Sequence, residues 1–240
     1  MRSDCLYLLM PCYNEEANIE TVINHWYSVC KELEEKGTRC HIVVANDGSK
    51  DGTLKKLNSL TEQIPILEVI DKANSGHGAT INFLYRYALE SHADYVFQTD
   101  SDGQTVPEDF FPLWDKREEY DFLIGDRCKR QDGVGRIIVT KVLRAVLYIS
   151  FGVWVKDANS PFRLMKARAL REVLDVIPND FALTNAAISA VSVKIKKYIC
   201  WKPITFKPRQ GGKNSINFRR IICIGINALS GFRQINRSLK

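Results

Sequence analysis

Two carboxylates one residue apart form the clearest candidate for chemistry. Asp100 and Asp102 directly follow an apolar, strand-like segment at residues 95–99, and Gln104 adds a third side-chain oxygen. Such oxygen ligands suit Mg²⁺ or Mn²⁺, which usually bind a few carboxylates together with substrate phosphates. A metal here would neutralise a diphosphate leaving group. The alternative interpretation is a pair of turn-forming aspartates before a helix that starts at Pro107.

Two further polar loops, at residues 11–16 and 46–53, follow strand-like segments. Asp47 could accept a hydrogen bond from a base edge or a ribose, as acidic residues at strand ends do in dinucleotide-binding folds. The acidic groups of the first loop cannot cradle phosphate, so we expect this loop to hold base and ribose. Both loops also fit helix starts, because Asp51 can cap a helix and Glu15 suits the helix dipole.

A glycine pair, Gly76 and Gly78, lies in the segment NSGHG at residues 74–78. It resembles the glycines of a phosphate loop but lacks the GKS/T ending. Close backbone approach to a ligand and a simple loop-to-helix turn both remain open. His77 could be a ligand or a base, although a loop histidine without a role is the better interpretation.

Strand-like and helix-like segments alternate around these loops. Strands are predicted at residues 6–10, 41–45, 66–70 and 95–99, and helices at residues 18–36, 53–61 and 79–91. This alternation indicates βαβ units and a mostly parallel sheet covered by helices. Ligands bind such sheets beyond the carboxyl ends of the strands, where the three polar loops are expected.

After Gly125 the pattern changes and basic residues become frequent. We expect a loop at residues 126–136, helices at 139–155, 167–175 and 185–193, a strand at 162–165, an edge strand at 201–207 and an amphipathic helix at 219–232. Aromatic residues interleave with the basic ones, a pattern that suits nucleic acid or an anionic amphiphile. A solvated basic face is the alternative.

Length and composition suit a soluble chain of one large domain, or of one domain with a small appendage, with 240 residues, 45% hydrophobic and 26% charged. The net charge of +6 favours anionic partners. Seven cysteines without metal-ligand spacing indicate a reducing compartment, hence the cytoplasm or a cytoplasmic membrane face. We expect no signal peptide and no membrane span, because Lys141 and Arg144 interrupt the most apolar stretch at residues 137–155.

Four motifs in this order and spacing resemble the family 2 glycosyltransferases with the GT-A fold. They are PCYNEE at 11–16, NDGSKDGT at 46–53, NSGHGA at 74–79 and DSDGQ at 100–104. The chain is most similar to the dolichyl-phosphate mannosyltransferase and bacterial polyprenyl-phosphate glycosyltransferase branch, over residues 5–215. The resemblance implies an α/β, Rossmann-like GT-A domain at residues 1–215 with a mostly parallel central sheet flanked by helices. Residues 1–125 would bind the nucleotide sugar, residues 126–215 the acceptor, and residues 216–240 would form a C-terminal amphipathic helix.

The resemblance also implies roles for individual residues. The metal ligands would be Asp100, Asp102 and Gln104, binding Mg²⁺ or Mn²⁺ on the donor diphosphate. The nucleotide sugar would be bound by Pro11, Tyr13, Asn14, Glu15, Asp47, Gly76, Gly78, Asp100, Ser101, Asp102, Arg209 and Lys213. The acceptor phosphate would be held by Arg127, Arg136 and Thr140, joined by Arg163. Pro161 departs from the D-x-x-x-G-F-R pattern of the relatives, and residues 209–215 look like the R-x-x-G-x-S loop that closes over the diphosphate.

These parts predict an inverting transfer from a UDP- or GDP-sugar. The metal and Arg209 or Lys213 would stabilise the leaving diphosphate while the acceptor attacks the opposite face of the anomeric carbon. A lipid phosphate of the polyprenyl or dolichyl type is already anionic and needs little general base. A sugar hydroxyl of a growing surface polysaccharide or glycolipid needs a carboxylate to take its proton, and Asp157 and Asp180 are the candidates.

Other functions stay open at this stage. One is a non-catalytic nucleotide- or RNA-binding module. Such a module would not require the metal triad Asp100, Asp102 and Gln104, so we expect no nucleic-acid partner. Another is a nucleotidyltransferase, which would release pyrophosphate instead of nucleoside diphosphate. Residues 219–229 could lie in a membrane interface, which would make the protein peripheral on the cytoplasmic face, or could form an ordinary packed helix. The oligomeric state is not predicted.

Overall fold

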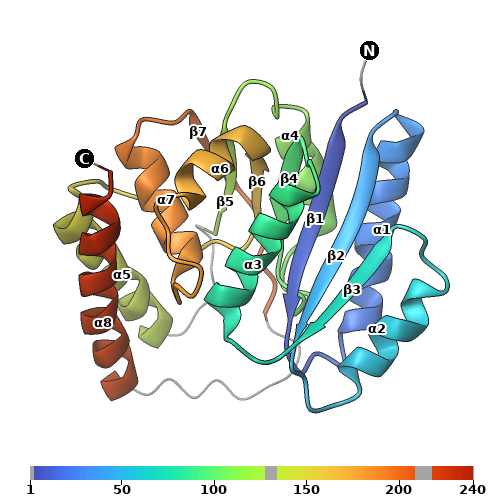
Figure 1. Ribbon diagram of the computed structural model, residues 1–240, viewed down its shortest axis with the longest axis horizontal. Helices are drawn as coiled ribbons and strands as arrows, with labels where there is room; N and C mark the ends of the chain where they lie inside the picture. The colour runs from blue at the N-terminus through green and yellow to red at the C-terminus, as the bar shows by residue number, and fades with distance from the viewer. Residues whose placement is uncertain (1–2, 128–133, 209–217, 240) are drawn as a thin grey trace.

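A seven-stranded, mostly parallel β-sheet forms the centre of the computed structural model (Figure 1). The structure describes residues 3–127, 134–208 and 218–239. In the helix Val134–Phe151 the side chains are described from residue 139 onward, and in the helix Phe218–Arg237 from residue 228 onward. The strands are β1 (Cys5–Cys12), β2 (Arg39–Asp47), β3 (Leu67–Lys72), β4 (Tyr95–Gln98), β5 (Phe122–Asp126), β6 (Arg163–Lys166) and β7 (Ile199–Pro203). Their order is β3-β2-β1-β4-β6-β5-β7, and of these strands only β6 runs antiparallel to its neighbours. The predicted α/β fold with a mostly parallel sheet is confirmed.

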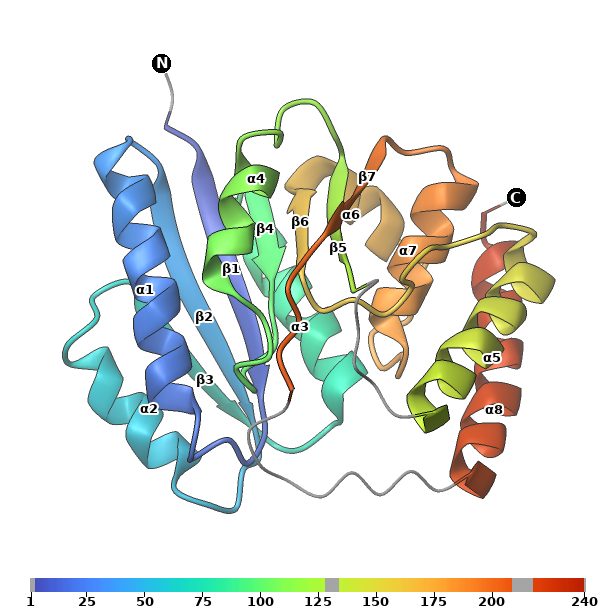
Figure 2. The ribbon, with the colours of Figure 1, turned by 180° about the vertical axis from the view of Figure 1, so that it is seen from behind.

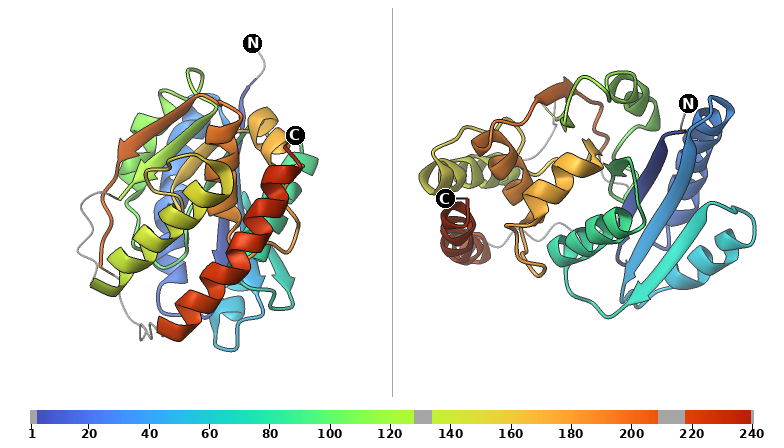
Figure 3. Two further views of the ribbon diagram at one scale, coloured as in Figure 1. Left: turned by 90° about the vertical axis from the view of Figure 1, so that its left-hand side faces the viewer. Right: turned by 45° about the horizontal axis from the view of Figure 1, so that its top comes forward.

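Helices cover both faces of the sheet. One face carries α1 (Ile19–Glu35), α2 (Thr53–Thr61), the short 3-10 helix η1 (Pro107–Phe110) and α4 (Phe111–Trp114), as Figure 2 shows. The other face carries α3 (His77–Glu90), α6 (Ala167–Leu174) and α7 (Thr184–Lys194). Beyond α7 lie α5 (Val134–Phe151) and α8 (Phe218–Arg237). They lie side by side at the end of the molecule opposite α1 and α2 (Figure 3).

The two-sided cover explains why β1 is apolar along its whole length. Leu8 and Met10 belong to the core beneath α1 and α2, whereas Tyr7 and Leu9 belong to the core beneath α3, α6 and α7. Successive side chains of a strand point to opposite faces, so a strand buried on both sides needs a continuous apolar run. This run brings the polar loop at residues 11–16 to the carboxyl edge of the sheet.

The chain order creates a switch point between β1 and β4. From β1 the chain moves to β2 and β3 on one side, whereas β4 pairs with β1 on the other side. Crevices of parallel sheets open at such reversals, because the connections leave in opposite directions. The loops that follow these two strands carry the motifs at residues 11–16 and 100–104.

All four strands and three helices predicted before residue 99 are present. The second part differs more from the prediction. Strand β5 was not predicted, because its apolar core of three residues, 122–124, is too short to stand out between charged neighbours. Helix α5 begins at Val134 and ends at Phe151, where Gly152 adopts a φ of 70°, rather than running from 139 to 155. The edge strand ends at Pro203, and Phe206 makes only an isolated bridge with Thr105.

Helix α8 confirms the predicted C-terminal helix and extends it to Arg237. In the half with described side chains, Ala228, Phe232 and Ile235 are buried against the rest of the core. This half therefore packs against the core. The segment predicted to lie in a membrane interface or to pack, residues 219–229, falls almost wholly outside the described side chains, so both alternatives for it stay predictions. Across the described residues, no helix combines the length and the apolarity that a membrane span requires.

Candidate active site

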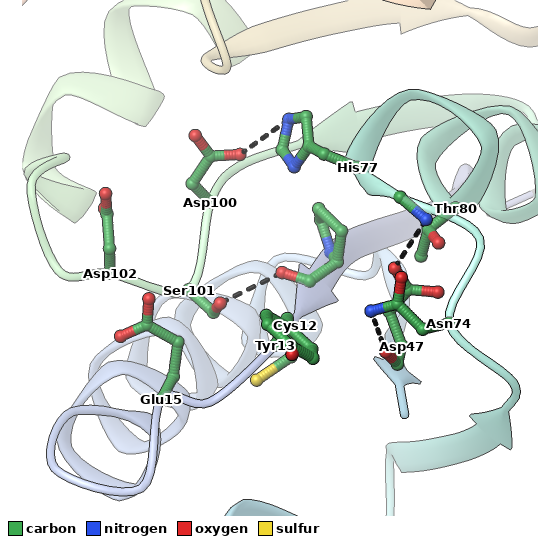
Figure 4. Close-up of a pocket in the computed structure, with 12 residues that line it drawn as sticks. Cys12, Tyr13, Glu15, Asp47, Asn74, His77, Thr80, Asp100, Ser101 and Asp102 are labelled. Atoms are coloured by element: carbon green, nitrogen blue, oxygen red, sulfur yellow. Dashed lines mark hydrogen bonds and ion pairs between the residues drawn. The ribbon is translucent and has the colours of Figure 1, made fainter. Parts of the chain in front are cut away.

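A cavity of about 430 Å³ opens at the switch point (Figure 4). The ends of β1 and β2, the loops after β1, β3 and β4, and the start of α3 surround it. It is lined by Pro11, Cys12, Tyr13, Glu15, Asp47, Asn74, Gly76, His77, Thr80, Asp100, Ser101 and Asp102. Eight of these twelve were predicted to bind the nucleotide sugar. Cys12, Asn74, His77 and Thr80 were not among the predicted binding residues.

The loops after β1 and β2 are locked together by hydrogen bonds. The N–H of Asn14 donates to Ser49 Oγ at 3.0 Å, and Asn14 Oδ1 accepts from the N–H of Lys50 at 2.8 Å. Glu16 Oε2 accepts from the N–H of Gly52 at 2.9 Å. Asn14 has a φ of 54°, a conformation that asparagine tolerates better than most residues. Asn14 lies outside the cavity lining and joins the two loops, while its predicted contact with the nucleotide sugar stays a prediction.

Asp47 is the centre of a buried network. Its Oδ1 accepts from Lys72 Nζ at 2.6 Å and from the N–H of Ser75 at 2.9 Å, and its Oδ2 accepts from the N–H of Gly76 at 3.0 Å. Burial alone would raise the pKa of this carboxyl, but the hydrogen bonds from Lys72 and Ser75 outweigh burial and lower it. Asp47 is thus a firmly ionised carboxylate that fixes the loop after β3. The sequence offered no signal for Lys72, because its partner is 25 residues away.

The two glycines of residues 74–78 differ in what requires them. Gly76 has a φ of 87°, which favours glycine, and it lines the cavity. At Gly78 a Cβ atom would lie 2.1 Å from the carbonyl oxygen of Ala182. Gly78 is therefore needed for close packing of α3 against the loop before α7. Its predicted contact with the nucleotide sugar is untested, and it lies outside the cavity lining.

Pro11, Cys12 and Ser101 form a neutral, hydrogen-bonded part of the cavity lining. Ser101 Oγ donates to the carbonyl oxygen of Pro11 at 2.9 Å and ties the loop after β4 to the end of β1. Burial raises the pKa of the Cys12 thiol to about 12, against a smaller lowering by Ser101. Cys12 is therefore a protonated thiol and unsuited to nucleophilic attack.

Asp100 and Asp102 lie on one side of the cavity, on the loop after β4 (Figure 4). Asp100 Oδ1 accepts from Gln98 Nε2 at 3.2 Å and lies 3.8 Å from Nε2 of His77. Gln104 donates its Nε2 to the carbonyl oxygen of Lys207 at 2.8 Å, so its amide nitrogen is occupied. Lys207 lies after β7, and its own N–H donates to the carbonyl oxygen of Gln104.

This donor set fits Mg²⁺ or Mn²⁺ in part. Within residues 3–127, 134–208 and 218–239, no group of three His, Cys, Asp or Glu side chains is arranged to hold a metal. The two carboxylates and the amide oxygen of Gln104 are hard oxygen donors, and a magnesium-type ion commonly takes its other ligands from phosphate and water. A diphosphate in the cavity would complete such a site.

Behind Asp100 lies a buried polar network that the sequence analysis missed. Gln98 Oε1 accepts from Asn185 Nδ2 at 3.0 Å and lies 3.3 Å from Tyr85 OH. Tyr85 OH donates to Asn185 Oδ1 at 2.9 Å. The network fixes the amide orientation of Gln98 and thereby the donor that holds Asp100. These residues come from α3, β4 and α7, and no local pattern links them.

A second cavity of about 260 Å³ adjoins the first. It is lined by Asp100, Asp102, Gln104, Arg127, Val139, Thr140, Leu143, Arg144, Asp157, Ala158, Asn159 and Phe206. Asp100 and Asp102 line both cavities, so the two cavities meet at the aspartate pair. Two of the predicted acceptor residues, Arg127 and Thr140, lie here, together with Arg144, whose role was not predicted.

Arg127 and Asp157 form a buried pair in this second cavity. Arg127 Nε donates to Asp157 Oδ2 at 2.7 Å and its Nη2 to Oδ1 at 2.8 Å, with both side chains less than a tenth exposed. Both carboxylate oxygens of Asp157 are thus occupied by one guanidinium. Asp180, the other candidate base, lies in the exposed loop before α7 and lines neither cavity.

Arg163 is fully buried on β6 and lines neither cavity. Its guanidinium donates to the carbonyl oxygens of Ser160 at 2.9 Å and Asn185 at 3.2 Å. Burial lowers the pKa of this guanidinium, which remains a cation in proteins. Its burial argues against the predicted direct contact with an acceptor and suits a supporting position behind the loop at residues 157–160.

Three predicted residues lie outside this geometry. Arg209 and Lys213 fall outside the described residues, and the side chain of Arg136 is likewise not described. Their expected contacts with diphosphate and acceptor stay predictions.

Comparison with known proteins identifies relatives along most of the chain. The family model of glycosyl transferase family 2 matches residues 7–183. A UDP-N-acetylglucosamine–dolichyl-phosphate N-acetylglucosaminyltransferase of Methanococcus voltae is 28% identical over 194 residues, covering 71% of this chain and 73% of the relative. An undecaprenyl-phosphate 4-deoxy-4-formamido-L-arabinose transferase of Pseudomonas aeruginosa is 27% identical over 174 residues, covering 71% and 50%. The chain thus spans about half the length of the arabinose transferase.

Solved structures share the fold. Glucosyl-3-phosphoglycerate synthase of Mycobacterium tuberculosis, crystallised with Mn²⁺, UDP and glucosyl-3-phosphoglycerate, superposes with a TM-score of 0.64 at 17% identity, covering 97% of this chain and 80% of the synthase. The S. aureus TarS structure superposes with a TM-score of 0.57 at 18% identity, covering 84% and 60%. The resemblance to glycosyltransferases with the GT-A fold, and to the branch acting on polyprenyl phosphates, is thereby confirmed.

Proposed function

Because the chain belongs to the family 2 glycosyltransferases, we propose that it moves a sugar from a nucleotide-diphospho-sugar to a lipid phosphate of the polyprenyl or dolichyl type. The transfer inverts the anomeric carbon and depends on Mg²⁺ or Mn²⁺. The observation that carries this proposal is the junction of the two cavities at Asp100 and Asp102. A donor in the first cavity and an acceptor in the second would meet at this pair.

The first cavity suits the donor. Tyr13 is about half exposed at its rim, and Glu15 is buried beside it, so that a ring and a carboxylate are available to a base and a ribose. Asp100 and Asp102 line this cavity, and in the proposed reaction the diphosphate would leave beside them. A divalent ion bound there would neutralise the charge that develops on the departing diphosphate. Gln98 holds Asp100 in place for this task.

The second cavity suits an anionic acceptor. Arg127 and Arg144 both line it. Among the described residues, Arg144 Nε is buried without a hydrogen-bond partner, whereas its Nη2 donates to the carbonyl oxygen of Lys156. A buried donor without a partner is costly, and a phosphate oxygen would satisfy it.

The Arg127–Asp157 pair favours a phosphate acceptor over a sugar hydroxyl. A hydroxyl must give up its proton to a base, but Asp157 has both oxygens engaged by Arg127. Asp180 lines neither cavity. A lipid phosphate brings an oxygen that is already anionic, so the chain need only position it and exclude water.

Five of the seven cysteines are described, and none of these five forms a disulfide. Free thiols suit a reducing compartment, and this supports placing the reaction on the cytoplasmic side of a membrane.

The test is turnover of a panel of UDP- and GDP-sugars by the purified protein, with Mn²⁺ or Mg²⁺ and with or without a short-chain polyprenyl phosphate. We expect metal-dependent release of nucleoside diphosphate that the lipid phosphate stimulates and that Asp102→Ala abolishes. Asp115→Ala, in an exposed turn outside both cavities, is the matched control. Release without lipid stimulation would point to a hydroxyl acceptor, and release of pyrophosphate would point to nucleotidyl transfer.

A further inference from the structure

Large apolar side chains are unusually exposed on α5 and the turn that follows it. Val142, Tyr148, Ile149 and Trp154 are 39%, 57%, 63% and 65% exposed. They are four of the seven large hydrophobic residues found exposed in the described part of the chain. The rings of Tyr148 and Trp154 meet edge to face, 6.5 Å between centroids. Single exposed apolar residues are common, but a contiguous group marks an interaction surface.

The exposed residues form one stripe along the helix. Lys141, Val142, Ala145, Tyr148 and Ile149 are exposed, whereas Leu147 and Phe151 are buried in the core. Spacings of three and four residues place the exposed group on one face. Helix α5 itself lies at the end of the molecule, with α8 as its neighbour (Figure 3). We call this stripe, together with Trp154, the α5 face.

The charges around the α5 face have one sign. Residues 133–156 contain four Lys and Arg and no Asp or Glu, and residues 181–240 contain twelve Lys and Arg and again no acidic residue. Helices α5 and α8 both belong to these acid-free stretches. Exposed Trp and Tyr beside basic residues are typical of surfaces that lie in the headgroup region of an anionic bilayer.

The α5 face and the second cavity share one helix. Val139, Thr140 and Leu143 line the cavity from the first half of α5, and the exposed stripe begins beside them at Lys141 and Val142. A helix that lies flat on a bilayer by its outer face would therefore keep its inner face at the acceptor cavity, close to the lipid surface.

We propose that the α5 face docks the protein on the surface of an anionic lipid bilayer. Val142, Tyr148, Ile149 and Trp154 enter the headgroup region, and Lys141 and its basic neighbours contact the lipid phosphates. Docking itself does not depend on the proposed function. Only the meaning of the docked orientation, in which the acceptor cavity lies close to the bilayer, rests on the proposed function. The docking surface is α5 and its following turn, rather than the described half of α8, whose apolar side chains are buried in the core.

The experiment is vesicle flotation of the purified chain without donor or acceptor. Vesicles consist of phosphatidylcholine alone or of phosphatidylcholine with phosphatidylglycerol. We expect binding only to the anionic vesicles and weakening by salt. Trp154→Glu should lower the binding constant by about tenfold or more, because one large side chain no longer leaves water. Adding Ile149→Glu should lower it further.

Matched variants separate the α5 face from the rest of the surface. Phe83→Glu changes an exposed ring on α3, and Lys55→Glu changes an exposed lysine on α2 as the control for Lys141→Glu. Both controls should bind vesicles like the unchanged protein, whereas Lys141→Glu should bind several-fold more weakly. In Trp154→Glu, the circular dichroism spectrum should be unchanged, which reports folding. Turnover with a water-soluble short-chain lipid phosphate should also be unchanged, which reports the reaction separately from docking.

Two results would overturn the proposal. The first is absence of flotation with anionic vesicles, or flotation that Trp154→Glu leaves intact. The second is a concentration-dependent dimer in sedimentation equilibrium that Trp154→Glu abolishes while vesicles are not bound, which would assign the α5 face to a second copy of the chain. Failure of the reaction with every donor would not affect either readout.

Discussion

The chain has two parts of opposite charge, residues 1–132 and residues 133–240. Both parts contribute to the cavity that contains the aspartate pair. Residues 1–132 contain 24 Asp and Glu against 14 Lys and Arg, whereas residues 133–240 contain 4 against 20. The modest net charge of +6 hides this contrast. An acidic surface repels a diphosphate unless a cation intervenes, and a basic surface attracts a phosphate directly. The contrast agrees with a metal-dependent donor cavity. In the acceptor cavity, Arg127 and Arg144 lie beside three carboxylates, so these two guanidiniums, rather than a uniformly basic lining, would attract a phosphate.

The two parts also differ in how their polar groups are satisfied. Around the first cavity, Asn14, Glu16 and Asp47 are held by hydrogen bonds within the protein. Around the second cavity, Arg127 is paired with Asp157, but Arg144 keeps a buried nitrogen without a partner among the described residues. Among the described residues, the loops of the donor side are therefore organised before a ligand binds, with Asn46 Oδ1 on β2 as a buried acceptor without a partner. The acceptor side retains a donor that a ligand can satisfy.

The largest effect is expected at the junction of the two parts. Asp102→Asn keeps the size of the side chain but removes the charge, and we expect kcat/KM to fall by about 10³-fold, equivalent to about 4 kcal/mol. Nucleoside diphosphate release measures this, with Asp115→Asn as the exposed control. Equal loss in both variants would show that overall negative charge, rather than the aspartate pair, supports activity.

A smaller effect is expected from breaking the buried pair of the acceptor side. Arg127→Ala leaves the buried side chain of Asp157 without its guanidinium partner, so we expect a loss of about 3 kcal/mol in the free energy of unfolding. For a chain of this size that lowers Tm by about 6–12 °C. In a double-mutant cycle with Asp157→Ala, the double variant should recover part of the loss. Strict additivity of the two changes would contradict a coupled pair.

The packing between the two parts is tested at Gly78. A Cβ atom in Gly78→Ala would overlap the carbonyl oxygen of Ala182, which belongs to the backbone and cannot move alone. We expect the free energy of unfolding to fall by about 2 kcal/mol. Gly76→Ala meets no atom within 4 Å, but its φ of 87° and ψ of 156° lie in a region essentially restricted to glycine, which lowers the free energy of unfolding by about 1–3 kcal/mol. Chemical denaturation measures both losses. A loss below about 1 kcal/mol for Gly78→Ala would contradict the assigned contact.

The smallest effect concerns the acidic part alone. The lowered pKa of Asp47 means that the folded state binds this proton more weakly than the unfolded state. Its stabilising contribution is complete above the unfolded pKa of about 3.9 and is lost as pH falls through the lower folded value. Asp47→Asn should therefore cost about 1 kcal/mol near neutral pH and progressively less in acid. Thermal unfolding between neutral and acidic pH measures it, and a difference independent of pH would exclude the ionised network.

The sequence predicted the first part of the molecule better than the second. The runs at residues 6–10 and 41–45 lie in strands buried on both faces, where a continuous apolar run is required and therefore visible. Strand β5 shows only three apolar residues between charged ones, and its place beside β7 depends on a partner 77 residues later in the chain. Patterns report local periodicity, whereas pairing across such a distance is decided by packing.

The same division holds within the candidate site. The sequence by itself determined the polar motifs at the carboxyl ends of β1, β2 and β4, since a strand that ends in a parallel sheet delivers its loop to one edge. It therefore found Asp100 and Asp102 and most of the first cavity. Only the tertiary structure placed Lys72 against Asp47, Gln98 behind Asp100, and Arg127 on Asp157. Hydrogen bonds and ion pairs depend on distance in space, and folding brings together side chains that no spacing along the chain connects.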